Sequence, residues 1–168
     1  MKLSRNIFCF LFLLFFICAK SQKKTAGSAE QFKGLWILDK YELYDSITKK
    51  WSTETGRIGY NGYILFDGNG HMALQITPAE YADFDVSKRK DSLGIKVLVN
   101  YYNNNLIFFA NYKVDGNEIE HEVLSSTNPE SIGAILKRDF EIKGKTLLLT
   151  PKNRFNGPKI RMKWVKVQ

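Results

Sequence analysis

The chain has 168 residues, and about 147 remain when the leader described below is set aside, enough for one domain but too few for two. Its 25 basic residues exceed its 17 acidic ones, giving a formal net charge of +8. The basic residues are spread out, with the tightest clusters at Lys23-Lys24, Lys49-Lys50 and Lys88-Arg89-Lys90. Nucleic-acid-binding proteins more often carry a dense basic stripe interleaved with aromatic residues, so nucleic acid is not a predicted partner.

The first 21 residues read as a secretory signal peptide. Met1 to Arg5 is positively charged, Ile7 to Cys18 is almost wholly apolar, and Ala19-Lys20-Ser21 offers small residues at the cleavage site. An apolar run of about a dozen residues is short of the roughly 20 that span a bilayer, which disfavours an uncleaved anchor. Lipid attachment at Cys18 is disfavoured too, because Phe15-Phe16-Ile17 is bulky where small residues are preferred. We therefore expect export to the periplasm or the medium, with no stable membrane span after cleavage.

Cleavage after Ser21 would remove both cysteines, Cys9 and Cys18. The mature domain would then have no disulfide and no cysteine metal site, and its core alone would hold it together. Loss of Lys2, Arg5 and Lys20 lowers the formal charge from +8 to +5.

The elements begin after a flexible lead-in at residues 22–31, and the predicted domain covers 32–168. Strands are predicted at 34–44, 58–66 and 71–77, with a loop or short hairpin end at 51–55. Asp67-Gly68-Asn69-Gly70 joins the second and third strands and is a strong hairpin signal, because Gly and Asn readily adopt positive φ.

One helix is predicted between the third and fourth strands, at 87–102. Leu93, Val97, Leu98, Tyr101 and Tyr102 recur at helical spacing, although Gly94 weakens the pattern. Five further strands follow at 106–114, 118–124, 134–142, 146–150 and 159–167, several joined by tight Gly-centred turns. The fold class is therefore all-β, with eight antiparallel strands.

Short hairpin connections favour an eight-stranded up-and-down barrel over a two-sheet sandwich with Greek-key links. Closure removes the exposed strand edges that an open sheet must protect. A barrel of this size is either filled by its own side chains or holds one small ligand.

Two ionisable residues fall on apolar strand faces. His121 alternates with Ile119 and Val123, and Arg138 with Leu136 and Phe140. Side chains two apart share one face of a sheet, so both are predicted to point into the core. Buried ionisable groups are costly unless paired, which marks a candidate site.

Three roles remain open for this pair. Arg138 could clamp a carboxylate or enolate together with His121. His121 could act as a general base, with Arg138 stabilising an oxyanion. Alternatively, both belong to a structural polar network with Tyr112 and Gln75.

Aromatic residues supply the other candidates. Trp36 and Trp164, on the first and last strands, suit a packed plug better than a ligand-stacking floor. A cluster around the helix could form an apolar lid, or simply dock the helix: Tyr101, Tyr102, Phe108, Phe109 and Tyr112. His71 is expected to be exposed. Two histidines without suitably spaced acids make a poor metal site, and no nucleotide-binding glycine motif follows a strand, so neither metal nor cofactor is predicted.

The ordered set of motifs resembles the lipocalin-like domain family. It comprises Gly34-Leu35-Trp36-Ile37-Leu38, the hairpin from Gly62 to Met72, His121, Asn128-Pro129, Gly133, Arg138 and the turn from Gly144 to Leu147. The resemblance runs from Phe32 to about Val167. It implies a small barrel, often exported in bacteria, with a helix over one mouth. Unlike true lipocalins, the chain has no bracing cysteine pair and no long helix after its last strand, so their ligands are not carried over.

The favoured function is binding of a small, mostly apolar molecule, with an acidic head group as an option. The ligand-contacting residues would be His121, Arg138, Tyr112, Gln75, Trp36 and Tyr102. One alternative is a structural or interaction module of the cell envelope with a filled barrel and an apolar outside, for which Ala134-Ile135 and Val165 to Val167 are candidates. The other is a small-molecule isomerase or cyclase with His121 as base.

Overall fold

The computed structural model describes residues 28–53, 60–83, 87, 92–152 and 159–167. The predicted signal peptide, and the predicted lead-in up to residue 27, lie outside these ranges. Within them, no helix has both the length and the apolar character needed to cross a bilayer.

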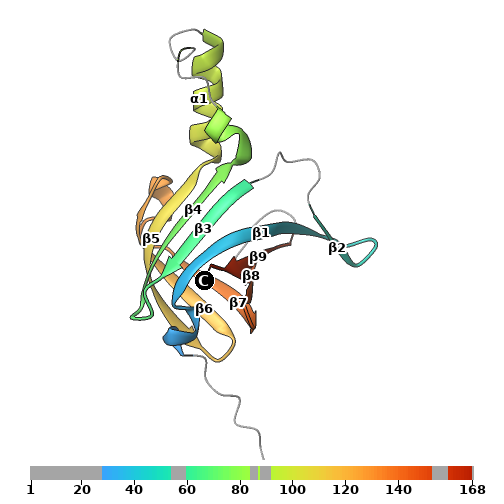
Figure 1. Cartoon of the computed structure of the whole chain (residues 1–168), viewed down its shortest axis with the longest axis vertical. Helices are drawn as coiled ribbons and strands as arrows, with labels where there is room; N and C mark the ends of the chain where they lie inside the picture. Colours follow the sequence, from blue (N-terminus) through green and yellow to red (C-terminus); the bar gives the residue numbers. More distant parts are fainter. Residues whose placement is uncertain (1–27, 54–59, 84–86, 88–91, 153–158, 168) are drawn as a thin grey trace, which may run out of the picture.

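Nine strands form one antiparallel sheet, which winds up and down in chain order except for the second strand, which pairs only with the first (Figure 1). The elements are η1 (Ala29–Phe32), β1 (Gly34–Asp45), β2 (Lys50–Thr53), β3 (Tyr60–Phe66), β4 (His71–Pro78), η2 (Ala79–Asp83), α1 (Ser92–Asn104), β5 (Leu106–Asp115), β6 (Glu118–Ser126), η4 (Pro129–Ser131), β7 (Ile135–Lys143), β8 (Thr146–Pro151) and β9 (Ile160–Lys166). Pairing of β1 with β9 closes the sheet. The predicted eight-stranded up-and-down barrel is confirmed, built of β1 and β3 to β9.

The additional strand, β2, shows that the predicted position of the helix in the strand order was wrong. It pairs with the far end of β1, where Glu42 to Asp45 face Lys50 to Thr53, and the two project from the barrel as an arm (Figure 1). Because β2 adds one strand near the start, α1 follows β4 and does not lie between the third and fourth strands. The rings of Tyr44 and Trp51 pack 5.2 Å apart and Arg161 stacks on Trp51, contacts that support so short a strand.

The β3–β4 hairpin forms at the predicted turn. Asp67 Oδ1 accepts hydrogen bonds from the backbone N–H groups of Asn69 (2.7 Å) and His71 (2.9 Å). Gly68 and Gly70 adopt φ of 82° and 103°, which side-chain-bearing residues rarely tolerate. The hydrogen bonds from His71, backbone first and ring second, lower the pKa of Asp67 to about 2. His71 is exposed, as predicted.

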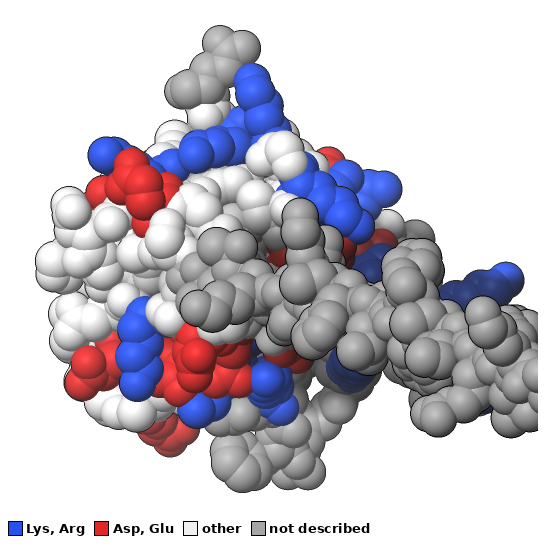
Figure 2. All heavy atoms as spheres, turned by 90° about the horizontal axis from the view of Figure 1, so that it is seen from below, with Lys and Arg blue, Asp and Glu red and all other residues white. Residues whose placement is uncertain are grey.

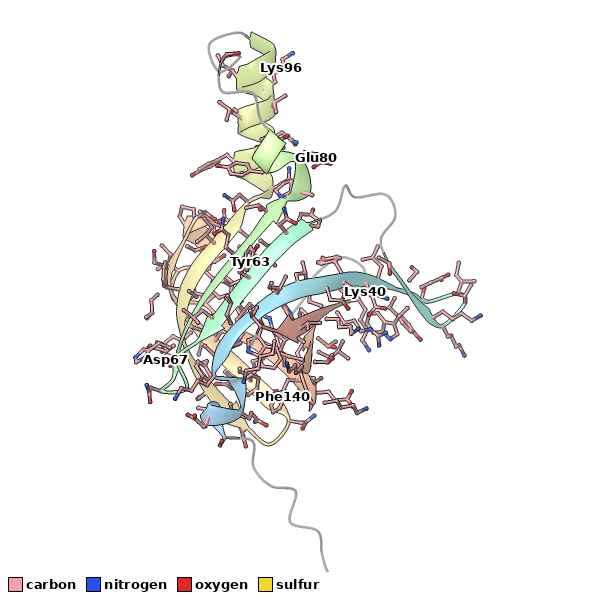
Figure 3. The ribbon with its side chains drawn as sticks, viewed as in Figure 1. Lys40, Tyr63, Asp67, Glu80, Lys96 and Phe140 are labelled. Carbon is pink, nitrogen blue, oxygen red and sulfur yellow. The ribbon has the colours of Figure 1, made fainter. Side chains whose placement is uncertain are left out.

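The lower end of the barrel is packed solid. Phe32 of η1 is fully buried and its ring lies 5.2 Å from Phe66 and 4.8 Å from Phe140, which marks this end in Figure 3. The indole N–H of Trp36 donates to the carbonyl oxygen of Phe32 at 2.7 Å, which fastens η1 to β1. Trp164 is also fully buried. The tryptophans therefore lie in a packed core, as the plug interpretation predicts.

Charged side chains concentrate on the outside of the β5–β8 wall. Glu120 lies between Lys113 and Lys137, its neighbours across the two adjacent strands. Hydrogen bonds from Lys113 and Lys137 lower the pKa of Glu120 to about 2. Opposite charges facing each other across strands stabilise the pairing modestly.

Candidate functional site

The upper half of the barrel is hollow, in contrast to the lower half. A cavity of about 440 Å³ opens at the end nearest α1. Its apolar and aromatic wall is formed by Tyr41, Tyr60, Ile76, Leu136, Ile160 and Met162. Asparagines at the end of α1, residues 103–105, together with Asn128 make part of the rim.

Arg138 is the charged residue whose side chain the strand pattern aims into this cavity. On β7 it alternates with Leu136 and Phe140, which pack against the core, and it is only 8% exposed. The β6–β7 register pairs Ile119 with Arg138 and places His121 opposite Leu136. Arg138 Nη1 donates a hydrogen bond of 2.6 Å to His121 Nδ1. The structure thus brings together the two ionisable residues that the sequence singled out.

His121 lies below the cavity, in the packed part of the core. It is 1% exposed, its ring centre is 6.2 Å from that of Phe66 and 6.3 Å from that of Phe108, and it is not part of the cavity lining. Burial, and then the positive charge of Arg138, hold the pKa of His121 well below its usual range. Because arginine can only donate, Nδ1 is the acceptor and the ring proton sits on Nε2. Nε2 is buried and has no hydrogen-bond partner among the described residues.

The guanidinium of Arg138 has no counter-charge in the part of the chain that the structure describes. His121 supplies its hydrogen bond, and no described carboxylate lies within salt-bridge distance. Burial lowers the pKa of Arg138 to about 10, which still leaves the group charged at neutral pH. A buried charge without an opposite partner is costly. The cavity is therefore an apolar cup whose wall carries a cation with no counter-charge among the described residues.

The lipocalin-like domain model matches residues 33–164, most of the chain and all of the barrel except the last two residues of β9. The chain belongs to the lipocalin-like domain family. Comparison with curated protein sequences gives no match. Membership of this family accounts for the barrel fold of this lipocalin-like domain. The chemistry of its cup follows from the residues described above.

The remaining predicted contact residues of this lipocalin-like domain do not join Arg138. Tyr112 lies at the packed lower end, where its hydroxyl donates to the carbonyl oxygen of Ala29 at 3.0 Å and burial raises its pKa. Trp36 is part of the lower core. Gln75 is exposed on the outer face of β4, because Leu74 and Ile76 occupy the inner face. The predicted network of His121 and Arg138 with Tyr112 and Gln75 is therefore wrong in its last two members.

Tyr102 is 67% exposed and lies on α1, which rises away from the barrel and does not cross its mouth (Figure 1). With Tyr81, Leu98, Val99 and Asn105 it lines a separate hollow of about 320 Å³ between η2 and α1. The hydroxyl of Tyr101 donates to the carbonyl oxygen of Glu80 at 2.9 Å, tying the helix to η2. The helix over the mouth that the resemblance implied is absent from the described structure.

The aromatic wall of the cup was missed from the sequence. Tyr41 and Tyr60 pack with ring centres 5.9 Å apart at the cavity. On β1 the inward positions pass from Trp36 and Leu38 to Tyr41, since a bulge between Leu38 and Lys40 shifts the alternation by one residue. No sequence pattern announces this bulge. Tyr60 is the first residue of β3, so no strand residue precedes it to show by alternation whether its side chain points into the barrel.

Burial of neutral His121 predicts an acid-sensitive fold. As pH falls below about 6.5, the imidazole of His121 becomes protonated in the unfolded chain but stays neutral in the folded chain. The free energy of unfolding therefore decreases by up to about 1.4 kcal/mol per pH unit. Asp67 and Glu120, with lowered pKa values of about 2, add their losses only nearer pH 4. Urea unfolding between pH 7 and about pH 5 should therefore show this slope.

His121→Asn should flatten that slope, since the carboxamide oxygen can accept from Arg138 and does not titrate. His71→Gln, at the exposed hairpin turn, is the matched control and should retain it. An unchanged slope in His121→Asn would show that another group sets the acid sensitivity.

Proposed function

We propose that the chain is an exported binding protein for a small, mostly apolar molecule with an acidic head group. The observation that carries the proposal is the buried guanidinium of Arg138, which borders a cavity of about 440 Å³ and has no described counter-charge. A carboxylate or similar anion would supply that charge.

The cavity has the size and composition of a small-molecule site. Such sites are concave, span roughly 300–1,000 Å³, and combine apolar walls with a few placed polar groups. Ile76, Leu136 and Met162 offer apolar surface, and Tyr41 and Tyr60 offer flat aromatic surface for the body of a ligand. Arg138 would orient the ligand, because a guanidinium can donate two parallel hydrogen bonds to a carboxylate.

Export is the second part of the proposal. It rests on the leader pattern, with its basic start, its short apolar run and the small residues at Ala19-Lys20-Ser21. A binding protein outside the cytoplasm, in the periplasm or the medium, could capture or carry such a molecule without a cofactor.

The two alternatives have less support. A barrel filled throughout does not suit a chain whose upper half encloses a cavity, although its lower half is filled. An isomerase or cyclase would need His121 to reach the substrate, but His121 lies outside the cavity lining and its Nδ1 already accepts from Arg138. Its lowered pKa makes it a weak base.

The test is extraction of the natively purified protein under denaturing conditions, followed by mass spectrometry of the released small molecules. We expect an acidic, mostly apolar compound in near-stoichiometric amount, depleted in Arg138→Gln. Arg161→Gln is the matched control, because Arg161 is also on the barrel but pairs with Glu42 at 2.6 Å outside the cavity. A neutral compound, or one retained equally by Arg138→Gln, would contradict the proposed head group.

A further inference from the structure

The outer face of β1, β3, β4 and β5 is apolar where an exposed sheet face is usually polar. Strand pairing places Leu35, Leu65, Ala73 and Phe109 side by side in one row across the four strands. A second row, two residues along each strand, contains Ile37, Tyr63, Gln75 and Ile107. We call these eight positions the two-row face; none of them is charged.

Six of the eight residues of the two-row face are exposed, and Ala73 and Ile107 are partly exposed. Leu65 is 51% exposed, Phe109 56% and Tyr63, labelled on β3 in Figure 3, 47%. Their immediate chain neighbours Ile64 and Phe108 are buried, so the exposure follows from the alternation of the strands and not from a gap in the core. Val165 of β9 extends the apolar area beside Ile37.

Charged residues lie outside this area. The ion pairs of the barrel wall lie on β5 to β8, around Glu118, Glu120 and Lys137, and between β1 and β9, where Lys163 pairs with Asp39 at 2.8 Å. From below, a broad uncharged area separates groups of acidic and basic side chains on the side of the barrel where β4 and β5 run (Figure 2). The two-row face is thus a bounded apolar surface.

Its area suits a protein–protein contact. The exposed parts of its large side chains together present roughly 500 Å² of apolar surface. This area is near the upper end of the largest apolar patches on typical monomers. A standard interface buries about 800 Å² per partner, of which somewhat over half is apolar. The two-row face therefore supplies the apolar share of one such interface.

We propose that the two-row face packs against the same face of a second copy of this chain, forming a symmetric dimer. An uncharged face is where two chains of equal net charge, +5 once the predicted leader with Lys2, Arg5 and Lys20 is removed, can approach with least repulsion. A nucleic acid or an anionic lipid surface would instead favour lysines on the face, and none occupies its eight positions. Two sheet faces stack about 10 Å apart, and a two-fold axis lets one patch serve both partners. The mouth of the cup, at the upper end, stays open in such a dimer.

Light scattering and sedimentation equilibrium of the purified protein, from about 1 to 200 µM, test the proposal. We expect a dimer, and we expect Leu65→Glu to weaken it by roughly 100-fold or more, because two like charges would meet in an apolar interface. Ile95→Glu is the matched control: Ile95 is 50% exposed but lies on α1, outside the face, and its variant should dimerise normally. Thermal midpoints and circular dichroism establish that each variant is folded.

Mixing Leu65→Glu with Leu65→Lys should restore dimers, since opposite charges then occupy the two faces. A wild-type protein that stays monomeric throughout overturns the proposal, as does a dimer that Leu65→Glu leaves intact. A monomer that floats with zwitterionic vesicles would assign the face to a lipid surface and equally overturn it.

Discussion

Arg138→Gln is expected to lower the affinity for a carboxylate ligand by roughly 10- to 100-fold. This loss corresponds to the roughly 1.5–3 kcal/mol that a hydrogen bond to a charged group contributes. Glutamine retains an amide that can donate toward His121 Nδ1, which now accepts from Arg138 at 2.6 Å, but it carries no charge. The effect should be specific to the head group. The affinity for the matching alcohol or amide of the same apolar body should change by less than about threefold.

Calorimetry or a displaced fluorescent probe can measure these four affinities, for acid and neutral ligand on wild type and variant. Arg161→Gln removes the same charge at the partly buried Glu42 pair and should leave the acid-to-neutral ratio unchanged. If Arg138→Gln lowered the affinities for the acid and the neutral ligand equally, Arg138 would shape the cup but would not recognise the charge of the ligand.

Trp36→Ala is expected to destabilise the fold by about 3–5 kcal/mol, the usual cost of truncating a buried tryptophan. Trp36 is fully buried, and its indole N–H holds the carbonyl oxygen of Phe32 at 2.7 Å. The variant would therefore both open a cavity in the lower core and release η1 from the barrel end. For a domain of this size, the thermal midpoint should fall by on the order of 10 °C.

Trp36→Phe separates the two contributions, since it preserves much of the packing but loses the hydrogen bond; a loss of about 1–2 kcal/mol is expected. Trp51→Ala is the matched control on the β1–β2 arm, where Trp51 packs on Tyr44 and Arg161 outside the core, and should cost less than about 1.5 kcal/mol. If Trp36→Ala and Trp51→Ala cost the same, the lower plug is not the main support of the barrel.

The barrel was predictable because local signals agreed with one another. Strand alternation from Ile119 to Val123 and from Leu136 to Phe140 placed His121 and Arg138 on one inner wall, and the Asp67–Gly70 turn supplied its own glycines and carboxylate. These features depend on residues close in the chain, which a sequence displays directly.

The rest depends on relations between strands that a sequence does not display. Tyr112 and His121 are direct partners across β5 and β6, yet the Tyr112 hydroxyl reaches down to Ala29 while Arg138 borders the cup above. The tilt and stagger of barrel strands set this difference in height. Gln75 is the exception, because it shares its face of β4 with the polar residues His71 and Thr77, a local signal for the outer face. Tyr41 was missed because the β1 bulge reverses the alternation.

The apolar outer face also explains why the sequence does not show which face of β3 and β5 is buried. Leu65 beside Ile64, and Phe109 beside Phe108, make β3 and β5 read as strands buried on both sides. The structure buries only one of each pair. A second copy on the two-row face would account for the other.

A crystal structure of the protein with a bound medium-chain carboxylic acid would show whether Arg138 holds an acidic head group inside the barrel. We expect the apolar chain of the acid to lie between Tyr41, Tyr60 and Met162, with the carboxylate within about 3 Å of the guanidinium of Arg138. A ligand bound with its carboxylate in solvent, or an upper barrel filled by its own side chains around Arg138, would contradict it.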